Sequence, residues 1–273
     1  MAESGAVDST RLTVVGSGDA FSGCGCNAAY LVDERVLIDC GSPVQALLPR
    51  AGMTVASIDL VLVTHFHADH TYMLPMLLGA RAFAGELRGG LTIGGPPGTR
   101  EYVLRLLNTG YGRHLVELIE QRLELQWAVF QDGANDVVAG YRVGAHAVVH
   151  STGPSLAYTV QRDEAAVIGF SGDTTLCAGL RRAIASADVM VCECTGWDGP
   201  TEGGHLWRGE LEQLIAEYPN TRFVLSHLRT RGTVAGAILA HDLLSIDVGA
   251  PSDRDASGSG RGPGRAAAEA GRK

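Results

Sequence analysis

Residues 61–70 read Val-Leu-Val-Thr-His-Phe-His-Ala-Asp-His, an apolar run followed at once by four side chains that can bind metal ions. The apolar run predicts a buried strand, and on an extended chain alternate residues share a face, so His65 and His67 project together. Asp69 and His70 come where the chain turns into a predicted helix, and from there they can reach a second ion. A helical zinc site would instead space two histidines by four residues beside a glutamate. The segment therefore predicts a site for two metal ions.

Three distant residues are suited to complete this site. His150, Asp173 and His227 each stand directly after an apolar run or one short turn beyond it, at the carboxyl end of a predicted strand, where a shared cleft would collect them. Taken alone, Asp173 is equally suited to cap the helix that follows it. Two ions need about six or seven ligands. The seven candidates are His65, His67, Asp69, His70, His150, Asp173 and His227.

The remaining pattern alternates short apolar runs with amphipathic segments. This order predicts an α/β (α+β) fold in which two sheets pack face to face and helices cover the outside. Strands are predicted at residues 12–15, 28–32, 36–38, 60–63, 91–93, 125–130, 141–149, 157–160, 166–170, 189–192 and 223–225. Helices are predicted at 43–51, 71–84, 99–108, 115–123, 175–187, 206–217 and 234–240.

The length of 273 residues, 45% of them hydrophobic, is sufficient for one large domain with a substantial core. Residues 1–9 are small and polar, and residues 249–273 consist mainly of Gly, Ser, Ala, Arg and Asp, so we expect both ends to be disordered. A single folded domain at 10–248 lies between them. The six cysteines form no C-x-x-C pair, which favours small buried thiols over a metal or disulfide role.

The net charge of −8 and a pI of about 5.6 disfavour a broad face for nucleic acid, because phosphate binding draws on clustered Lys and Arg. Two divalent ions would add about four positive charges inside the cleft, so this argument applies to large RNA more than to a small anionic substrate. No apolar run approaches 18 residues, and no leader pattern opens the chain. We expect a cytoplasmic protein without a membrane partner.

Taken together, the motifs resemble the metallo-β-lactamase superfamily. They are Thr-His-Phe-His-Ala-Asp-His at 64–70 with a downstream His, Ser-Gly-Asp-Thr at 171–174 and Ser-His at 226–227. The turns at 15–21 and 37–41 resemble those that frame the site in its ribonuclease Z-like branch. The resemblance implies an αββα sandwich of two mixed sheets flanked by helices. It also implies two zinc ions, one held by His65, His67 and His150, the other by Asp69, His70 and His227, with Asp173 between them. Iron or manganese would also suit these ligand types.

The mechanism that the resemblance implies is hydrolysis by a metal-bridging hydroxide, because two zinc ions lower the pKa of water from about 15.7 towards about 7. Asp69 would orient that hydroxide. His205, in Glu-Gly-Gly-His-Leu at 202–206, resembles the general-acid histidine of the branch, although the branch continues with Ser or Thr where this chain has Leu206. Glu193 would orient His205. The alternatives are a loop histidine and a solvated or helix-capping glutamate.

The sequence differs from ribonuclease Z at three features that bind RNA in that family. Only the 22 residues 151–172 separate His150 from Asp173, which leaves no room for the branch's RNA-binding arm. The expected Arg-Asn pair reads Cys-Asn at 26–27, and the family's His-Phe-Ser-x-Arg-Tyr motif reads His-Leu-Arg-Thr-Arg-Gly from 227. Arg229 and Arg231 are candidates to bind an anionic group of the substrate, and the alternative is that they are ordinary surface arginines.

The leading hypothesis is a dinuclear zinc hydrolase acting on a small anionic ester, a phosphodiester or an aryl sulfate. The first alternative is a lactonase or thioesterase of the same fold. Further alternatives are a tRNA 3′-endonuclease of the ribonuclease Z type and a non-catalytic, metabolite-binding relative. The segment 95–127, which contains Tyr102, Tyr111, His114 and Trp127, is a candidate lid or homodimer face.

Overall fold

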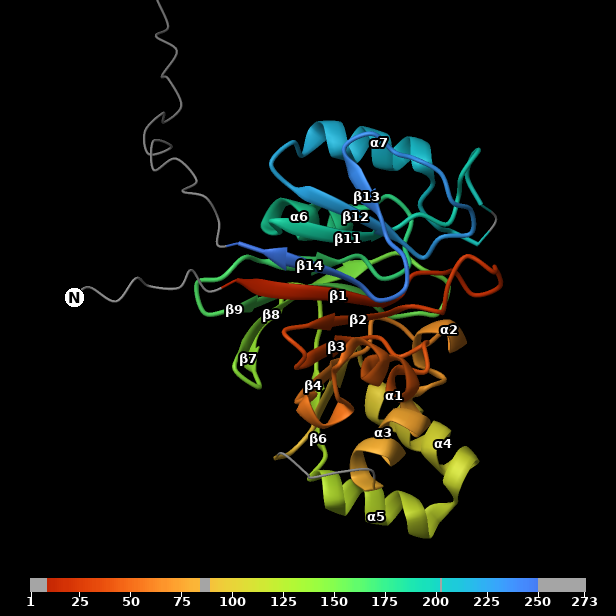
Figure 1. The fold of residues 1–273 in the computed structure, drawn as a ribbon, viewed down its shortest axis with the longest axis vertical. Helices are drawn as coiled ribbons and strands as arrows, with labels where there is room; N and C mark the ends of the chain where they lie inside the picture. Colours follow the sequence, from red (N-terminus) through yellow and green to blue (C-terminus); the bar gives the residue numbers. More distant parts are fainter. Residues whose placement is uncertain (1–8, 84–88, 202, 250–273) are drawn as a thin grey trace, which may run out of the picture.

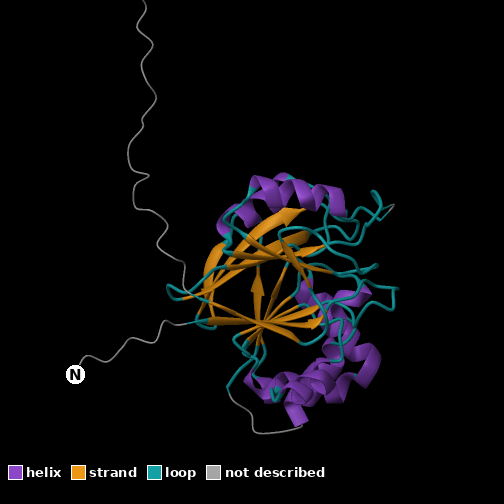
Figure 2. Ribbon diagram, turned by 45° about the horizontal axis from the view of Figure 1, so that its top comes forward, coloured by secondary structure: helices purple, strands orange, loops and turns teal. Residues whose placement is uncertain are grey.

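Two seven-stranded sheets face each other at the centre of the protein, and helices cover the outer face of each (Figures 1 and 2). The computed structural model describes residues 9–83, 89–201 and 203–249. The four layers confirm the predicted αββα sandwich. The predicted disorder of residues 1–9 and 249–273 lies outside the described residues, apart from Ser9 and Gly249.

The first sheet is built from the N-terminal half of the chain and its last strand. It is mixed, with antiparallel pairs from β14 to β3 and parallel pairs from β3 to β6. The central strands are apolar on both faces, because one face meets the second sheet and the other meets helices. In spatial order the strands are β14 (Leu244–Val248), β1 (Thr10–Gly16), β2 (Ala29–Val32), β3 (Val36–Ile38), β4 (Leu60–Leu62), β5 (Thr92–Gly95) and β6 (Gln126–Val129).

The second sheet repeats this arrangement in the later part of the chain. Its pairs are parallel from β13 to β10 and antiparallel from β10 to β7. Asp173 and His227 follow the ends of its parallel strands β10 and β12. In spatial order the strands are β13 (Ala237–Leu239), β12 (Arg222–Ser226), β11 (Val189–Glu193), β10 (Ile168–Phe170), β9 (Ser155–Arg162), β8 (Tyr141–Val148) and β7 (Asn135–Val138).

The helices divide between the two outer faces. Those on the first sheet bury one apolar cluster, and α6 and α7 bury another on the second sheet. Among the described residues, none of the helices combines the length and the apolar character that crossing a membrane requires. The helices are α1 (Val44–Leu47), η1 (Leu48–Ala51), η2 (Val55–Ser57), α2 (Ala68–Thr71), α3 (Leu74–Phe83), α4 (Thr99–Tyr111), α5 (Arg113–Leu123), α6 (Ala178–Ser186) and α7 (Arg208–Glu217).

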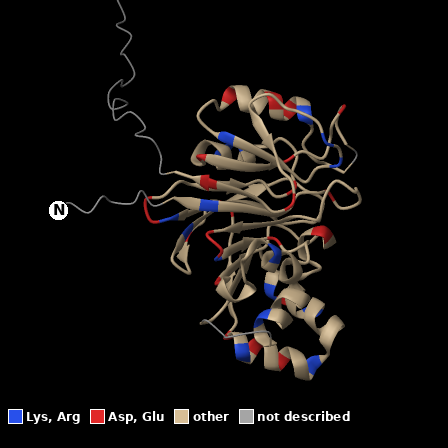
Figure 3. Ribbon diagram, viewed as in Figure 1, with Lys and Arg blue, Asp and Glu red and all other residues tan. Residues whose placement is uncertain are grey.

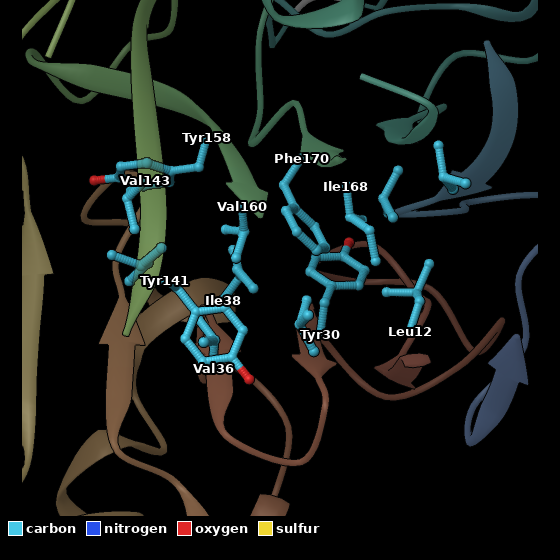
Figure 4. Packing of buried hydrophobic residues seen from close by; sticks show 14 of the residues in the cluster. Leu12, Tyr30, Val36, Ile38, Tyr141, Val143, Tyr158, Val160, Ile168 and Phe170 are labelled. Carbon is cyan, nitrogen blue, oxygen red and sulfur yellow. The ribbon is translucent and has the colours of Figure 1, made fainter. Parts of the chain in front are cut away.

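The core between the sheets joins aromatic and branched side chains from both halves of the chain (Figure 4). Tyr30 of β2 and Phe170 of β10 place their ring centroids 5.7 Å apart, in a tilted arrangement that aromatic pairs favour. Tyr158 of β9 is fully buried, and its hydroxyl donates to the carbonyl of Val63. These contacts fix how the two sheets meet, and so they fix the relative positions of the strand ends that carry the candidate ligands.

Three parts of the predicted pattern need correction. The helix predicted at 234–240 is wrong, because Ala237–Leu239 forms β13, which pairs in parallel with β12. Strands β7, β13 and β14 were not predicted, since edge strands have exposed positions and weak apolar patterns. The predicted helix at 71–84 is two helices, α2 and α3, and its last residue lies outside the described part. Pro75 lacks a backbone N–H, so a helix begins there more easily than it continues.

Candidate metal centre

The candidate ligands meet at the edge where the strands end. His65 and His67 lie in the extended segment after β4, and His67 is the residue that precedes α2, with φ −68° and ψ 154°. Asp69 and His70 occupy the first turns of α2. Figure 1 shows α2 beside the loop that joins β1 to β2 at this edge. His67 is extended as predicted, whereas the helix predicted to begin at Thr71 already begins at Ala68 and includes Asp69 and His70.

All seven predicted ligands fall into two groups of donors that share Asp173. The ligand atoms of His65, His67, His150 and Asp173 lie within 4.8 Å of one another. Within this group His67 Nδ1 lies 3.2 Å from His65 Nε2 and 3.0 Å from His150 Nε2. The fold thus brings His65 and His67 together with residues 83 to 108 positions further along the chain. The structure places no candidate ligand outside the two groups.

The second group contains Asp69, His70, Asp173 and His227, again within 4.8 Å. His227 Nε2 lies 3.1 Å from Asp69 Oδ2, and His70 Nε2 lies 3.3 Å from Asp173 Oδ1. His227 adopts φ 54°, an uncommon left-handed conformation for a residue other than glycine. This conformation turns the chain back as β12 ends and directs the imidazole towards the other donors.

The chemistry of these donors fits divalent metal ions. Burial lowers the pKa of His65 well below its usual value and the pKa of His150 to about 4, so both imidazoles are neutral and offer an electron pair. Asp173 Oδ1 and His70 Nε2 are buried and lie 3.3 Å apart without well-aligned hydrogen-bond geometry, and neither atom has another hydrogen-bond partner in the described part of the chain. Unpaired buried polar atoms are costly, and a cation between them would satisfy both.

The acids of the second group favour positive charge at this position. Burial alone would lower the pKa of His70, but the charges of Asp173 and Asp39 outweigh it and raise that pKa well above its usual value. The pKa of Asp173 is held well below its usual range, because neighbouring charges, that of His227 first, outweigh the cost of burial. A field that stabilises an imidazolium stabilises a metal ion in the same place.

Asp39 anchors the metal-binding segment. The sequence indicated this residue only as part of the turn at 37–41, without a role of its own. Its Oδ1 accepts from the backbone N–H of Thr64 at 2.8 Å, and its Oδ2 accepts from the Thr64 hydroxyl at 2.7 Å. The same Oδ2 lies 2.7 Å from His70 Nδ1. A hydrogen on Nδ1 leaves Nε2 as the free donor atom, which is how carboxylates orient metal-binding histidines. The signal in the sequence was a charged residue between an apolar strand and Cys40-Gly41.

Glu193 and His205 form a second pair beside the two groups. His205 Nδ1 lies 3.1 Å from Glu193 Oε1 and 3.2 Å from Oε2. Glu193 is buried, which excludes the solvated alternative, and its Oε1 accepts from the backbone N–H of Thr174. Burial alone would lower the pKa of His205, but the hydrogen bond and the charge of Glu193 raise it above its usual value. The ring of His205 also stacks on His227, at 5.4 Å between centroids.

Thr195 joins the two histidines through Glu193, and sequence reasoning missed it. Its hydroxyl donates to Glu193 Oε2 at 2.8 Å and lies 2.8 Å from His227 Nδ1, from which it can accept. Glu193 therefore holds His205 directly and His227 through one hydroxyl. Nothing in the single sequence marked this threonine, because the contact depends on β11 and β12 lying side by side.

Arg229 and Arg231 contact the loop between β1 and β2. Arg229 Nε donates to Asp19 Oδ2 at 2.8 Å, while about half of its side chain is exposed. Arg231 donates to the backbone carbonyls of Ala240 and Cys24. Both arginines thus tie the strand end that carries His227 to its neighbours, and their predicted role in substrate binding remains a prediction.

Helix α4 supports the site from the other side. Tyr102 stacks on Phe66, with 4.7 Å between ring centroids, and its hydroxyl donates to the Phe66 carbonyl at 2.9 Å. The aromatic side chain therefore packs directly behind the His65–His67 segment.

The six cysteines are free, and burial raises the pKa of Cys40 and Cys192, which keeps those thiols protonated.

With this geometry established, the class of protein can be stated. The chain belongs to the β-lactamase superfamily, because the model of the β-lactamase superfamily domain matches residues 34–228. It is a ribonuclease Z-like member with a metal-dependent hydrolase fold. It is 27% identical to ribonuclease Z of Methanosarcina mazei over 80% of this chain and 90% of that protein. It is 26% identical to ribonuclease Z of Listeria monocytogenes over 90% of this chain and 91% of that protein.

Solved structures share the fold at lower identity. The metallo-β-lactamase fold protein YhfI of Bacillus subtilis superposes with a TM-score of 0.70 at 20% identity, covering 88% of this chain and all of that one. Human tRNase Z, short form, gives 0.68 at 21% identity over 87% and 99%. A diphosphatase from the PhnP family gives 0.64 at 18% identity over 89% and 99%.

Proposed function

We propose that this protein is a dinuclear metal-dependent phosphodiesterase that acts on small anionic phosphodiesters. The observation that carries the proposal is the His205–Glu193 pair, set against two donor groups that share Asp173. Two bound divalent ions, zinc by preference, would supply an activated water and offset the negative charge of the substrate. The two ions would not protonate the departing oxygen, and the imidazole–carboxylate pair of His205 and Glu193 can perform that step.

Each of the remaining roles follows from a contact. His205 Nδ1 binds Glu193, so Nε2 is free to donate a proton to the leaving group. Asp69 is partly buried, and its Oδ2 lies 3.1 Å from His227 Nε2, where it can orient the attacking water. In this assignment Glu193 positions His205 and does not touch the substrate.

Size and charge favour a small substrate. Residues 151–172, all of which are described, contain a turn, β9, a second turn and β10, with no projecting arm. In the ribbon view of Figure 3, Lys and Arg are scattered over both halves of the molecule. A broad RNA-binding surface needs clustered basic residues.

A second candidate is a tRNA 3′-endonuclease, and it is supported by similar curated proteins of Methanosarcina mazei, Methanosarcina acetivorans and Listeria monocytogenes, which are named ribonuclease Z. A third is a lactonase or thioesterase, in which the same centre attacks a carbonyl. The solved structures with this fold include both yeast PDE1 and an isothiocyanate hydrolase, so the fold itself does not choose between phosphorus and carbon. A non-catalytic binder would need no general acid.

The experiment compares rates on one metal-loaded preparation. Substrates are bis-(p-nitrophenyl) phosphate, p-nitrophenyl sulfate, a lactone, a thioester and a precursor tRNA, with Asp69→Ala as the inactive control. The proposal expects the phosphodiester to give the highest kcat/KM of the small substrates and to depend on Asp69. Faster cleavage of precursor tRNA would support the second candidate, and faster lactone or thioester hydrolysis the third. Less than one metal ion per chain, with no turnover, would support the non-catalytic reading.

A further inference from the structure

The second sheet carries a cavity of about 350 Å³ on its outer face, away from the metal centre. Its floor is formed by β7, β8 and β9, and its wall by Val167 and Ser186, where α6 ends. None of the lining residues belongs to either donor group. Gly144 at its centre precedes His150 by six residues along an extended chain, or roughly 20 Å. Small-molecule sites in proteins have volumes of about 300–1,000 Å³.

A glycine keeps the floor of this cavity open. Gly144 pairs with Asn135 on one neighbouring strand and with Thr159 on the other. A Cβ at Gly144 would lie 2.4 Å from Thr159 Oγ1, so a side chain here would occupy the space that the ligand needs. Because alternate residues share a face, Arg142 and His146 flank the glycine on the same side of the sheet.

The polar groups around the glycine lack partners. Arg142 makes no ion pair or hydrogen bond through its side chain within the described ranges. His146 Nε2 is buried without a hydrogen-bond partner among the same residues. The neighbouring carboxylate of Asp132 already binds Arg182 and the backbone N–H of Ala147, and no Asp or Glu lines the cavity. The site therefore offers one free cation and unpaired polar atoms to a ligand.

We propose that this cavity binds a small metabolite through an oxyanion group, a phosphate or a carboxylate. Arg142 would bind the oxyanion through two parallel N–H groups, the geometry that distinguishes arginine from lysine. His146 Nε2 and the Thr159 hydroxyl would complete the contacts on either side of Gly144. The site is separate from the reaction centre and does not depend on which ester the protein hydrolyses.

The test is isothermal titration calorimetry of the zinc-loaded full-length chain with adenosine monophosphate, with adenosine as the uncharged comparison. Wild-type protein is expected to bind the nucleotide, and Arg142→Ala to weaken that binding at least about tenfold, with Arg142→Lys retaining part of it. Gly144→Val should abolish it. Arg11→Ala, a surface arginine on the other sheet paired with Asp247, is the matched control and should bind normally.

Two further experiments locate the binding site and classify its ligand. Competition by inorganic phosphate but not citrate assigns the site to phosphate, and competition by both assigns it to oxyanions in general. His67→Ala should keep this binding, because the metal centre is a different site. Equal binding by wild type and Arg142→Ala, equal affinity for adenosine, or loss of all binding in His67→Ala would overturn the proposal. Turnover of bis-(p-nitrophenyl) phosphate without nucleotide should be unchanged in the Arg142 variants, and thermal unfolding checks that Gly144→Val is folded.

Discussion

His205 Nδ1 lies 3.1 Å from Glu193 Oε1, and the two residues are brought together by a loop that crosses the end of β11. A carboxylate on Nδ1 holds the ring in one orientation and leaves Nε2 unbound to the carboxylate. The proposed role of His205 as a proton donor depends on this arrangement. Its consequences can be measured without knowing the natural substrate.

The His205→Ala variant should lose activity in proportion to the basicity of the leaving group. Protonation of a poor leaving group contributes about 10²–10⁴-fold to rate, whereas nitrophenolate leaves with little help. We therefore expect kcat to fall by about two orders of magnitude or more on an alkyl phosphodiester and much less on bis-(p-nitrophenyl) phosphate. Rate constants on a series of esters provide the measurement. An equal loss on every ester would assign His205 to metal or substrate binding instead.

Replacing Thr195 by Val should weaken metal binding without changing the volume of the side chain appreciably. The hydroxyl orients His227 through Nδ1, and loss of such a contact costs about 10–100-fold in metal affinity. Competition with a fluorescent zinc chelator measures the effect. Thr195→Ser keeps the hydroxyl and is the matched control, so equal affinities in the two variants would contradict the assigned role.

Metal analysis should find two ions per chain in wild-type protein and less than one in Asp173→Ala, because both donor groups use Asp173. A chelator should lower the thermal unfolding temperature and abolish turnover, since ligands that bind only the folded state stabilise it. Adding back zinc, iron or manganese separately identifies the active metal. Asp136→Ala, an exposed position on β7, should keep full metal content. A wild-type metal content in Asp173→Ala would exclude the shared site.

Asp19 should stabilise the fold at neutral pH and lose this effect in acid. Burial would raise its pKa, but hydrogen bonds from Ser22 and Arg229 outweigh burial and lower it below the usual 3.8. The stabilisation is therefore present above pH 3.8 and is lost as the pH falls through the lower, folded pKa. We expect Asp19→Asn to cost about 1 kcal/mol at pH 7, because Arg229 is half exposed. Urea unfolding at several pH values should show the two proteins converging in acid, and a constant difference would exclude the linkage.

Gly41→Ala should destabilise the protein and impair the metal centre together. A Cβ at this position would lie 1.6 Å from the backbone oxygen of Asp69, so the turn and α2 cannot both keep their places. Overpacking of this kind costs about 1–3 kcal/mol. Gly110→Ala, in α4 with no atom near the added Cβ, should be neutral or stabilise by up to about 1 kcal/mol. Chemical denaturation and zinc content check both variants, and normal zinc binding by Gly41→Ala would contradict the expected coupling.

Most of the sandwich was predictable because its central strands are apolar on both faces and stand out as short runs. The edge strands were not, since β7 and β13 face solvent and pair with neighbours that are not evident from local pattern. The helix predicted at 234–240 failed for the same reason. Its residues form a strand only because β12 offers a free edge for pairing.

The residue types and their spacing by themselves determined the chemical class of the site, since imidazoles and carboxylates after apolar strands suit few roles other than metal binding. The tertiary structure decided which of these groups meet and what orients them. Asp39 and Thr195 act through contacts with His70 and His227, which lie 31 and 32 residues further along the chain. Hydrogen bonds and packing between layers depend on how the sheets dock, which no local pattern of residues encodes.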